Sequence, residues 1–129
     1  MVNIKVADEV WIATAMLHWA YPDREDFAEA EIVEQARSEK VTSGELLRPG
    51  VKIHINSHCV AQKTPNRGRY RMLTETAKGR RRLYRPGDSC HRERINGKGV
   101  PELSDIPTEY HHLIEWYRQD YARNNRATL

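Results

Sequence analysis

Apolar residues in the first third of the chain recur every three or four positions, the period of an amphipathic helix. Residues 6–20 carry such a stripe at Val6, Val10, Ala13, Met16, Leu17 and Ala20. We expect this helix to end at Tyr21, because a residue that precedes a proline avoids the helical region. A second helix is predicted to begin near Phe27, which itself suits a short strand just before the helix. Its inward stripe would be Ala28, Ile32, Val33 and Ala36.

The middle of the chain predicts a third helix and then a β-hairpin. Pro49 suits the first turn of a helix, where its missing amide is not needed, so the third helix is expected to run from Pro49 to about Gln62. Its inward positions would be Val51, Ile55, Cys59 and Val60. After a turn at 64–68, two strand-like runs at 69–76 and 80–85 are joined by a short glycine-containing connector, as in a hairpin.

The last third predicts an irregular connector and one more helix. Residues 88–107 are rich in Gly, Pro, Ser and charged side chains, which favours irregular structure. Residues 108–124 show helical periodicity at Tyr110, Leu113, Ile114, Tyr117 and Tyr121. We therefore predict an α+β, mainly α, single domain over residues 1–129. It would consist of a winged-helix core of three helices and a two-stranded basic hairpin at 6–87, a connector at 88–107 and an extra C-terminal helix at 108–124.

The charge distribution changes this picture more than the net charge of +3 does. Residues 1–47 contain four basic and ten acidic side chains, residues 48–98 contain fourteen and three, and residues 99–129 contain three and five. Such a concentrated basic segment creates a local positive potential, and a phosphate backbone is the commonest partner for one. The segment coincides with the third helix and the hairpin. Its alternative interpretation is a solvated face without a partner.

Other features bound the function classes. The sequence has no apolar run of about 18 residues and no signal-peptide pattern, so we expect a cytoplasmic protein that does not enter a membrane. Two cysteines do not form a disulfide framework. No cofactor motif is present, and we expect a non-enzymatic protein that needs none.

A winged helix binds DNA by placing its third helix in the major groove and its hairpin, or wing, against the adjacent backbone or minor groove. The sequence therefore predicts double-stranded DNA as the partner. Base contacts are expected from the third helix, through Lys52, His54, Asn56 and His58. Phosphate or minor-groove contacts are expected after it, from Lys63, Arg67, Arg69, Arg71, Lys78, Arg80, Arg81 and Arg82.

A family resemblance supports the same fold. The runs that carry it are residues 27–33 (FAEAEIV), 48–51 (RPGV), 69–73 (RYRML), 82–88 (RLYRPGD) and the Leu-x-x-Trp-Tyr of residues 113–117. Over roughly residues 6–118, the chain resembles the HARE-type winged helix-turn-helix module that accompanies restriction endonucleases and some chromatin factors. It resembles even more an uncharacterised prokaryotic winged-helix-like domain. The resemblance implies DNA binding, in transcription regulation or in a restriction or defence system.

Several alternatives stay open at this point. A zinc site could be formed by His54, His58, Cys90 and His91, although no Cys-x-x-Cys pair supports it. A metal-dependent nuclease could use Asp88, His91 and Glu93, whereas a structural Asp88 would close the turn after Pro86-Gly87. The basic face could instead meet RNA or an acidic protein. The aromatic stripe of the last helix is typical of core packing, and it could also form a homodimer seam.

Overall fold

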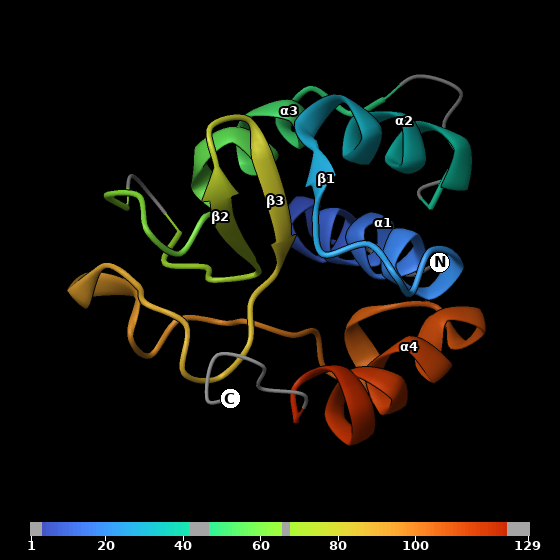
Figure 1. Cartoon of the computed structure of the whole chain (residues 1–129). Coiled ribbons are helices and arrows are strands. Elements are labelled where there is room, and N and C mark those ends of the chain that lie inside the picture. The colour runs from blue at the N-terminus through green and yellow to red at the C-terminus, as the bar shows by residue number, and fades with distance from the viewer. Residues whose placement is uncertain (1–3, 42–46, 66–67, 124–129) are drawn as a thin grey trace.

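The structure is a computed structural model, and it describes residues 4–41, 47–65 and 68–123. Along the chain lie α1 (Val6–Ala20), β1 (Phe27–Ala28), α2 (Glu29–Glu39), α3 (Gly50–Ile53) with its π-helical continuation η1 (His54–His58), β2 (Leu73–Ala77) and β3 (Arg80–Leu83) (Figure 1). Single 3-10 turns follow at η2 (Arg92–Arg94), η3 (Leu103–Asp105) and η4 (Thr108–Tyr110). The last described elements are α4 (His111–Trp116) and the π-helical η5 (Tyr117–Tyr121). The fold is α+β and mainly α, as predicted.

Helix α1 has the predicted bounds, and it forms the centre of the core. Trp11 and Ile12 are completely buried, although a surface helix would expose one of two neighbouring positions. Helices α2, α3 and α4 all pack against α1, and Tyr117 of η5 meets the Trp11 ring edge-on at 5.9 Å. Because α1 is covered on most sides, its polar residues are buried too, namely Asp8, Glu9, Thr14 and His18.

The sheet has three antiparallel strands in the order β1-β3-β2. The short strand predicted at Phe27 is confirmed, and Phe27 pairs with Arg81 of β3. The hairpin is confirmed as well, with Leu73 opposite Leu83 and with Gly79 at φ 75° in its turn. Strand β2 begins at Leu73 rather than at residue 69, because the amide of Arg71 donates to Lys98 O (2.9 Å) and not to a strand.

The third helix is shorter than predicted and ends at His58 instead of near Gln62. The chain leaves the helix there to run beside β2: Leu73 N donates to Cys59 O (3.0 Å), and Ala61 N donates to Leu73 O (2.8 Å). These strand-like bonds replace the helical ones that residues 59–62 would have made. The predicted inward positions are confirmed, since Val51, Ile55, Cys59 and Val60 are all buried.

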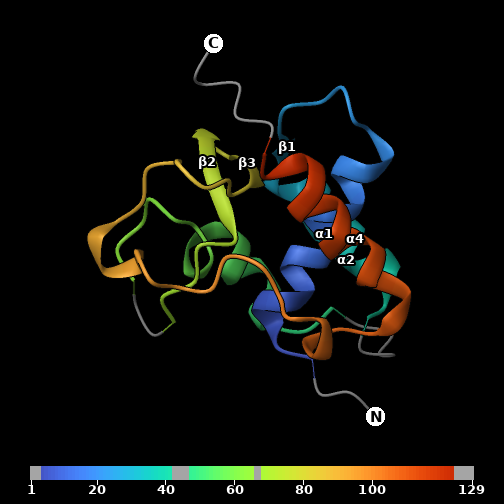
Figure 2. The ribbon, with the colours of Figure 1, turned by 90° about the horizontal axis from the view of Figure 1, so that it is seen from below.

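Three helices and two irregular segments lie on different sides of the hairpin. Seen from below, α1, α2 and α4 gather on one side of the hairpin, whereas residues 62–65, 68–71 and 88–98 lie on the other (Figure 2). The predicted connector at 88–107 is irregular apart from the turns η2 and η3. Within the described ranges, no helix is long and apolar enough to cross a membrane.

The C-terminal helix is present, although it begins as a 3-10 turn and ends as a π-helix. The end predicted at residue 124 lies outside the described residues. Its stripe of Tyr110, Leu113, Ile114, Tyr117 and Tyr121 is buried inside this same chain. Dimerisation through this helix stays a prediction, and a dimer would have to use the other face of the helix.

Candidate nucleic-acid interface

The three consecutive arginines of β3 each bind a carboxylate of the same chain. Arg80 donates to Asp26 Oδ1 from Nη2 (2.7 Å) and Nε (3.1 Å). Arg82 donates two hydrogen bonds to Asp88, both of 2.8 Å. Arg81 is only 1% exposed. The prediction that all three contact DNA is therefore wrong for Arg81, which no phosphate can reach, and in this conformation the charges of Arg80 and Arg82 are already compensated.

Arg81 joins the hairpin to the third helix and to α2. Its Nε donates to Ile55 O (3.1 Å) and its Nη2 to Asn56 O (3.2 Å), both carbonyls of η1. The same Nη2 lies 3.3 Å from Glu29, and Nη1 lies 3.5 Å from Glu75. A buried charge is tolerated when it is paired and its donors are satisfied, and both conditions hold here. Arg81 thus fixes the third helix relative to the hairpin.

Glu29 brings three elements together at one end of the molecule. Its Oε1 accepts from Asn56 Nδ2 of η1 (3.3 Å), its Oε2 accepts from Arg81, and its amide donates to Gly79 O in the hairpin turn (3.0 Å). The third helix and the turn are therefore neighbours, and Figure 1 shows both at its upper end. Lys52 and Lys78 are exposed on these two elements, and neither forms an ion pair with a described residue.

The predicted base-reading residues of the third helix have different surroundings. Lys52 and Asn56 are exposed, whereas His54 and His58 are half-buried. His54 Nδ1 is 2.8 Å from Gly50 O, and its ring stands edge-on against His58 at 4.9 Å between centroids. Burial lowers the pKa of His54, and the nearby His58 and Arg48 lower it further. The hydrogen bond to Gly50 acts in the opposite direction but does not cancel the shift. We therefore expect Lys52 and Asn56, rather than the two histidines, to be accessible to a partner.

The loop residues after the third helix are spread over several environments. Arg69 is exposed and pairs with Glu93 at 3.0 Å on the surface. Arg71 is half-buried, donates to Gly97 O (3.1 Å), and lies over the Tyr84 ring. Lys63 is half-buried, and the predicted contact at Arg67 lies outside the described residues.

Asp88 holds the hairpin together, as the structural interpretation of that residue expected. Its Oδ2 accepts from the amide of Arg85 (2.7 Å) and from the hydroxyl of Thr74 (2.8 Å), in addition to Arg82. Asp88 N also donates to Arg85 O (3.0 Å), which closes the turn after the hairpin. Burial alone would raise the pKa of Asp88, but these hydrogen bonds outweigh it and hold the pKa below its usual value.

The residues of the proposed zinc site have other partners. His91 donates its amide to Ala61 O (2.7 Å), and its Nδ1 accepts from the amide of Glu93 (3.1 Å). Cys90 is a half-buried free cysteine, and Cys59, which was predicted as a core residue and not as a ligand, is buried. Among the residues that the structure describes, no group of three or more His, Cys, Asp or Glu side chains is arranged to hold a metal ion.

A functional residue that sequence reasoning missed is Arg94, in the segment expected to be an irregular connector. It is 0% exposed, and its guanidinium donates to five main-chain carbonyls. These belong to Ser57, His58, Lys63, Thr64 and Tyr70. No sequence signal marks this burial, since arginine is seldom fully buried and its partners are main-chain atoms.

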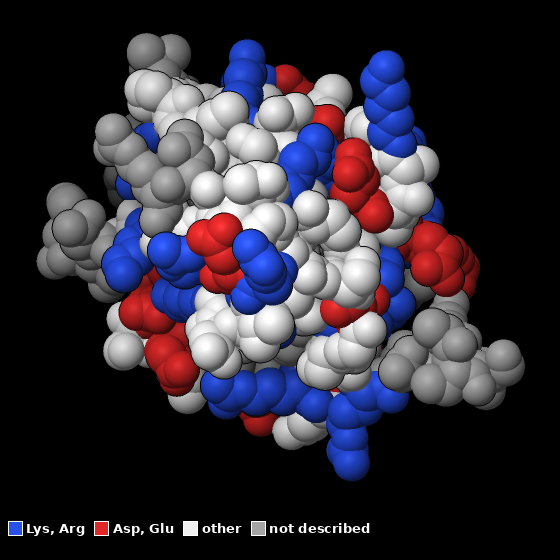
Figure 3. Space-filling model, turned by 90° about the vertical axis from the view of Figure 1, so that its left-hand side faces the viewer, with Lys and Arg blue, Asp and Glu red and all other residues white. Residues whose placement is uncertain are grey.

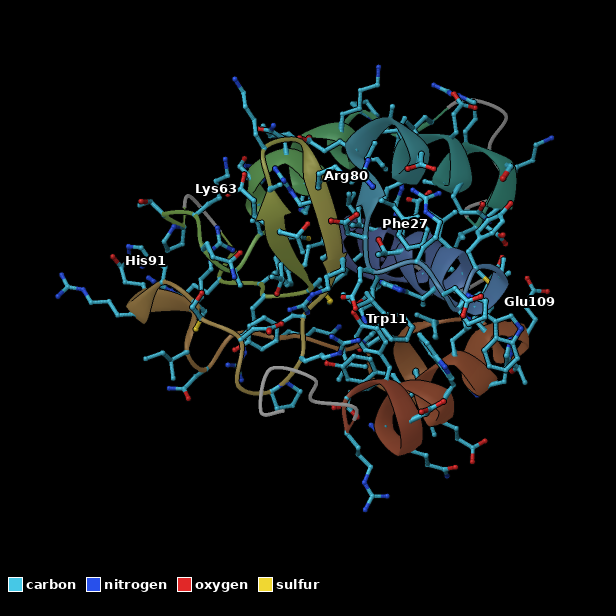
Figure 4. The ribbon with its side chains drawn as sticks, viewed as in Figure 1. Trp11, Phe27, Lys63, Arg80, His91 and Glu109 are labelled. Atoms are coloured by element: carbon cyan, nitrogen blue, oxygen red, sulfur yellow. The ribbon has the colours of Figure 1, made fainter. Side chains whose placement is uncertain are left out.

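On the face that Figure 3 shows, the cationic groups do not merge into one continuous area. Figure 3 shows Lys and Arg side chains separated by Asp and Glu and by uncharged surface. In Figure 4, Lys63 lies to the left of the hairpin, whereas Arg80 lies toward β1 and α2. Compared with known proteins, the chain matches no protein-family model, no curated protein and no solved structure.

Proposed function

We propose that this chain is a winged-helix protein that binds double-stranded DNA through the third helix and the hairpin turn, with the β3 arginines as internal supports. The order of elements supports it: three helices precede a two-stranded hairpin, as expected for a winged helix, and β1 extends the hairpin to three strands. The single observation that carries the proposal is the bridge through Glu29. It joins the exposed face of the third helix to the hairpin turn, so both elements can meet one duplex.

Each exposed group has a distinct role in this proposal. Lys52 and Lys78 neutralise phosphates, and they position the protein without reading sequence. Asn56 reads a base edge, for which adenine is the best geometric match. Its present bond to Glu29 is long, at 3.3 Å, and exposed, so a base can replace it, and Glu29 then stays linked to the third helix through Arg81. Ile53, at 43% exposure beside Lys52, offers an apolar contact for a thymine methyl group.

The proposal differs from the sequence prediction in where the positive charge acts. The β3 arginines organise the wing, while lysines at its turn and on the third helix face the partner. Arg80 and Arg82 each form two hydrogen bonds to a carboxylate that is largely buried, and an arginine in such a pair gains little by exchanging the carboxylate for a phosphate. Lys63 and Arg69 supply further phosphate contacts from the loop after the third helix.

Fluorescence anisotropy with labelled duplex DNA, single-stranded DNA and an RNA hairpin tests the proposal. We expect the duplex to bind most tightly and its log K to fall linearly with log salt concentration. The slope per neutralised phosphate is about −0.9, so contacts by Lys52, Lys63, Arg69 and Lys78 give a slope of about −3.6. Tighter binding of the RNA hairpin, or the absence of duplex binding at low salt, would overturn the proposal.

A further inference from the structure

The segment 88–98 packs against the loop that follows the third helix. Its contacts are numerous, and most of them have a main-chain carbonyl as the acceptor: His91 N donates to Ala61 O (2.7 Å), Gln62 Nε2 donates to Ser89 O (2.8 Å), and Arg71 N donates to Lys98 O (2.9 Å). At Gly97 the two segments of the chain approach so closely that an added Cβ would lie 1.5 Å from Arg69 O. The irregular segment is therefore held firmly against residues 61–65 and 68–71.

Arg94 lies at the centre of this contact, and no described residue supplies a counter-ion for its charge. Its five hydrogen bonds all go to neutral carbonyls, and among the described residues no carboxylate forms an ion pair with it. Two of the acceptors, Ser57 O and His58 O, belong to the end of the third helix, where the helix dipole is negative. Arginine stays protonated in proteins, so a full positive charge remains just below the surface.

The groups above Arg94 are also mainly cationic. Arg92 is exposed and forms no ion pair with a described residue, and Lys63 is half-buried. Within the described ranges Arg69 pairs only with Glu93, and both side chains are about half exposed, at 60% and 48%. Exposed pairs of this kind contribute little free energy, so Arg69 can exchange Glu93 for another anion. Figure 3 looks onto this side of the molecule, and Figure 4 shows Lys63 and His91 together there.

We propose that residues 88–98 contribute a second DNA-contacting element, in which Arg92 binds the phosphate backbone of the same duplex beside Lys63 and Arg69 of the neighbouring loop, beyond the part held by the third helix. This inference rests on the proposed function. A duplex fits better than a small anion because the three cations are spread over two loops and do not converge on one point. The buried charge of Arg94 raises the positive potential beneath them, and in the low dielectric of the interior it is poorly screened.

The test measures duplex affinity for Arg92→Ala and Glu93→Gln. Arg94 stays intact, because its replacement would leave five carbonyls unsatisfied and unfold the segment. We expect Arg92→Ala to weaken binding about three- to tenfold at 0.1 M salt and to reduce the salt slope by about 0.9. Glu93→Gln is expected to tighten binding about two- to fivefold, because it frees Arg69 and removes a like charge from the path of the phosphates. Arg118→Ala, which removes an exposed arginine from η5, is the matched control and is expected to bind as the wild type does.

The outcomes separate this inference from the proposed function. If the wild type binds duplex DNA while Arg92→Ala and Glu93→Gln both match Arg118→Ala, the second element is excluded and the proposed function stands. If the wild type binds no duplex, both fail. If the two variants change affinity for the RNA hairpin but not for the duplex, the surface serves RNA, and the inference of a duplex-binding element is overturned.

Discussion

The Arg81 guanidinium lies 3.3 Å from the Glu29 carboxylate, and it is almost completely buried where the hairpin, the third helix and α2 meet. This pair shows how a residue type that suits phosphate binding serves the interior instead. Arg81 pairs with Phe27 across the sheet, so its side chain enters the space between the sheet and η1. Arg81 therefore fixes the position of the hairpin and adds no charge to its surface.

Replacing Arg81 with methionine is expected to destabilise the fold. The change keeps much of the apolar stem but leaves Glu29 Oε2 and the carbonyls of Ile55 and Asn56 without their donor. Breaking one side of a buried ion pair costs about 3–5 kcal/mol. Urea denaturation measures the free energy of unfolding, with Arg69→Ala as the control, since its exposed pair is worth less than about 1 kcal/mol. Equal stabilities for the two variants would show that Arg81 is not a structural support.

Asp88→Asn is expected to lower the free energy of unfolding by about 2 kcal/mol, because Arg82 loses its charged partner and the turn loses acceptors. The depressed pKa of Asp88 also has a pH consequence. Its carboxylate stabilises the fold fully above its unfolded pKa near 3.8, and that stabilisation is lost as the pH falls through the folded value. Thermal unfolding at pH 7 measures the first effect. A melting temperature equal to that of the wild type would argue against a structural role.

His18 makes stability depend on pH over a higher range. Its Nε2 accepts from the amide of Leu83 (3.2 Å), and its ring packs against Phe27, Trp116 and Tyr121. Burial first, and then the charges of Arg85 and Arg82, lower the pKa of His18 to about 3, while Asp26 opposes the shift.

The unfolded state takes up a proton on His18 more readily than the folded state does. His18 therefore leaves the free energy of unfolding unaffected above about pH 6.5 and lowers it as the pH falls toward 3. The cost approaches about 1.4 kcal/mol per pH unit. We expect His18→Gln, which keeps an acceptor, to lose less stability than the wild type between pH 6.5 and 5. Urea titrations at both pH values measure this difference, and parallel losses in the two proteins would contradict the assignment.

Gly79 is expected to resist replacement by a β-branched residue. Its φ of 75° lies in the left-handed region, although nothing lies within 4 Å of the place where a Cβ would be. The cost of Gly79→Val is therefore backbone strain alone, about 1–2 kcal/mol. Gly79→Asn, which tolerates that region better, is the matched control. Equal unfolding free energies for the two variants would show that the turn relaxes to another conformation.

The sequence predicted most elements, because their signals are local. The period of α1, the proline at the start of the third helix and the glycine connector of the hairpin each act within a few residues. The burial and the partners of the arginines could not be predicted from such local signals. Whether Arg81 points inward depends on the strand register, and the five acceptors of Arg94 are carbonyls brought together only by the folded chain. A charge count along the sequence includes such buried and paired groups. The count for residues 48–98 is therefore larger than the free positive charge on the surface of this segment.

The central claim is that lysines on the third helix and the hairpin turn, joined by the Glu29 bridge, face the duplex. Anisotropy with the double variant Lys52→Ala/Lys78→Ala tests it most directly, against Arg118→Ala/Arg123→Ala, which removes the same charge from the C-terminal region. We predict that the lysine variant melts as the wild type does, binds duplex DNA roughly thirty- to hundredfold more weakly at 0.1 M salt, and loses about 1.8 from the salt slope. Equal affinities for the two double variants would contradict the account.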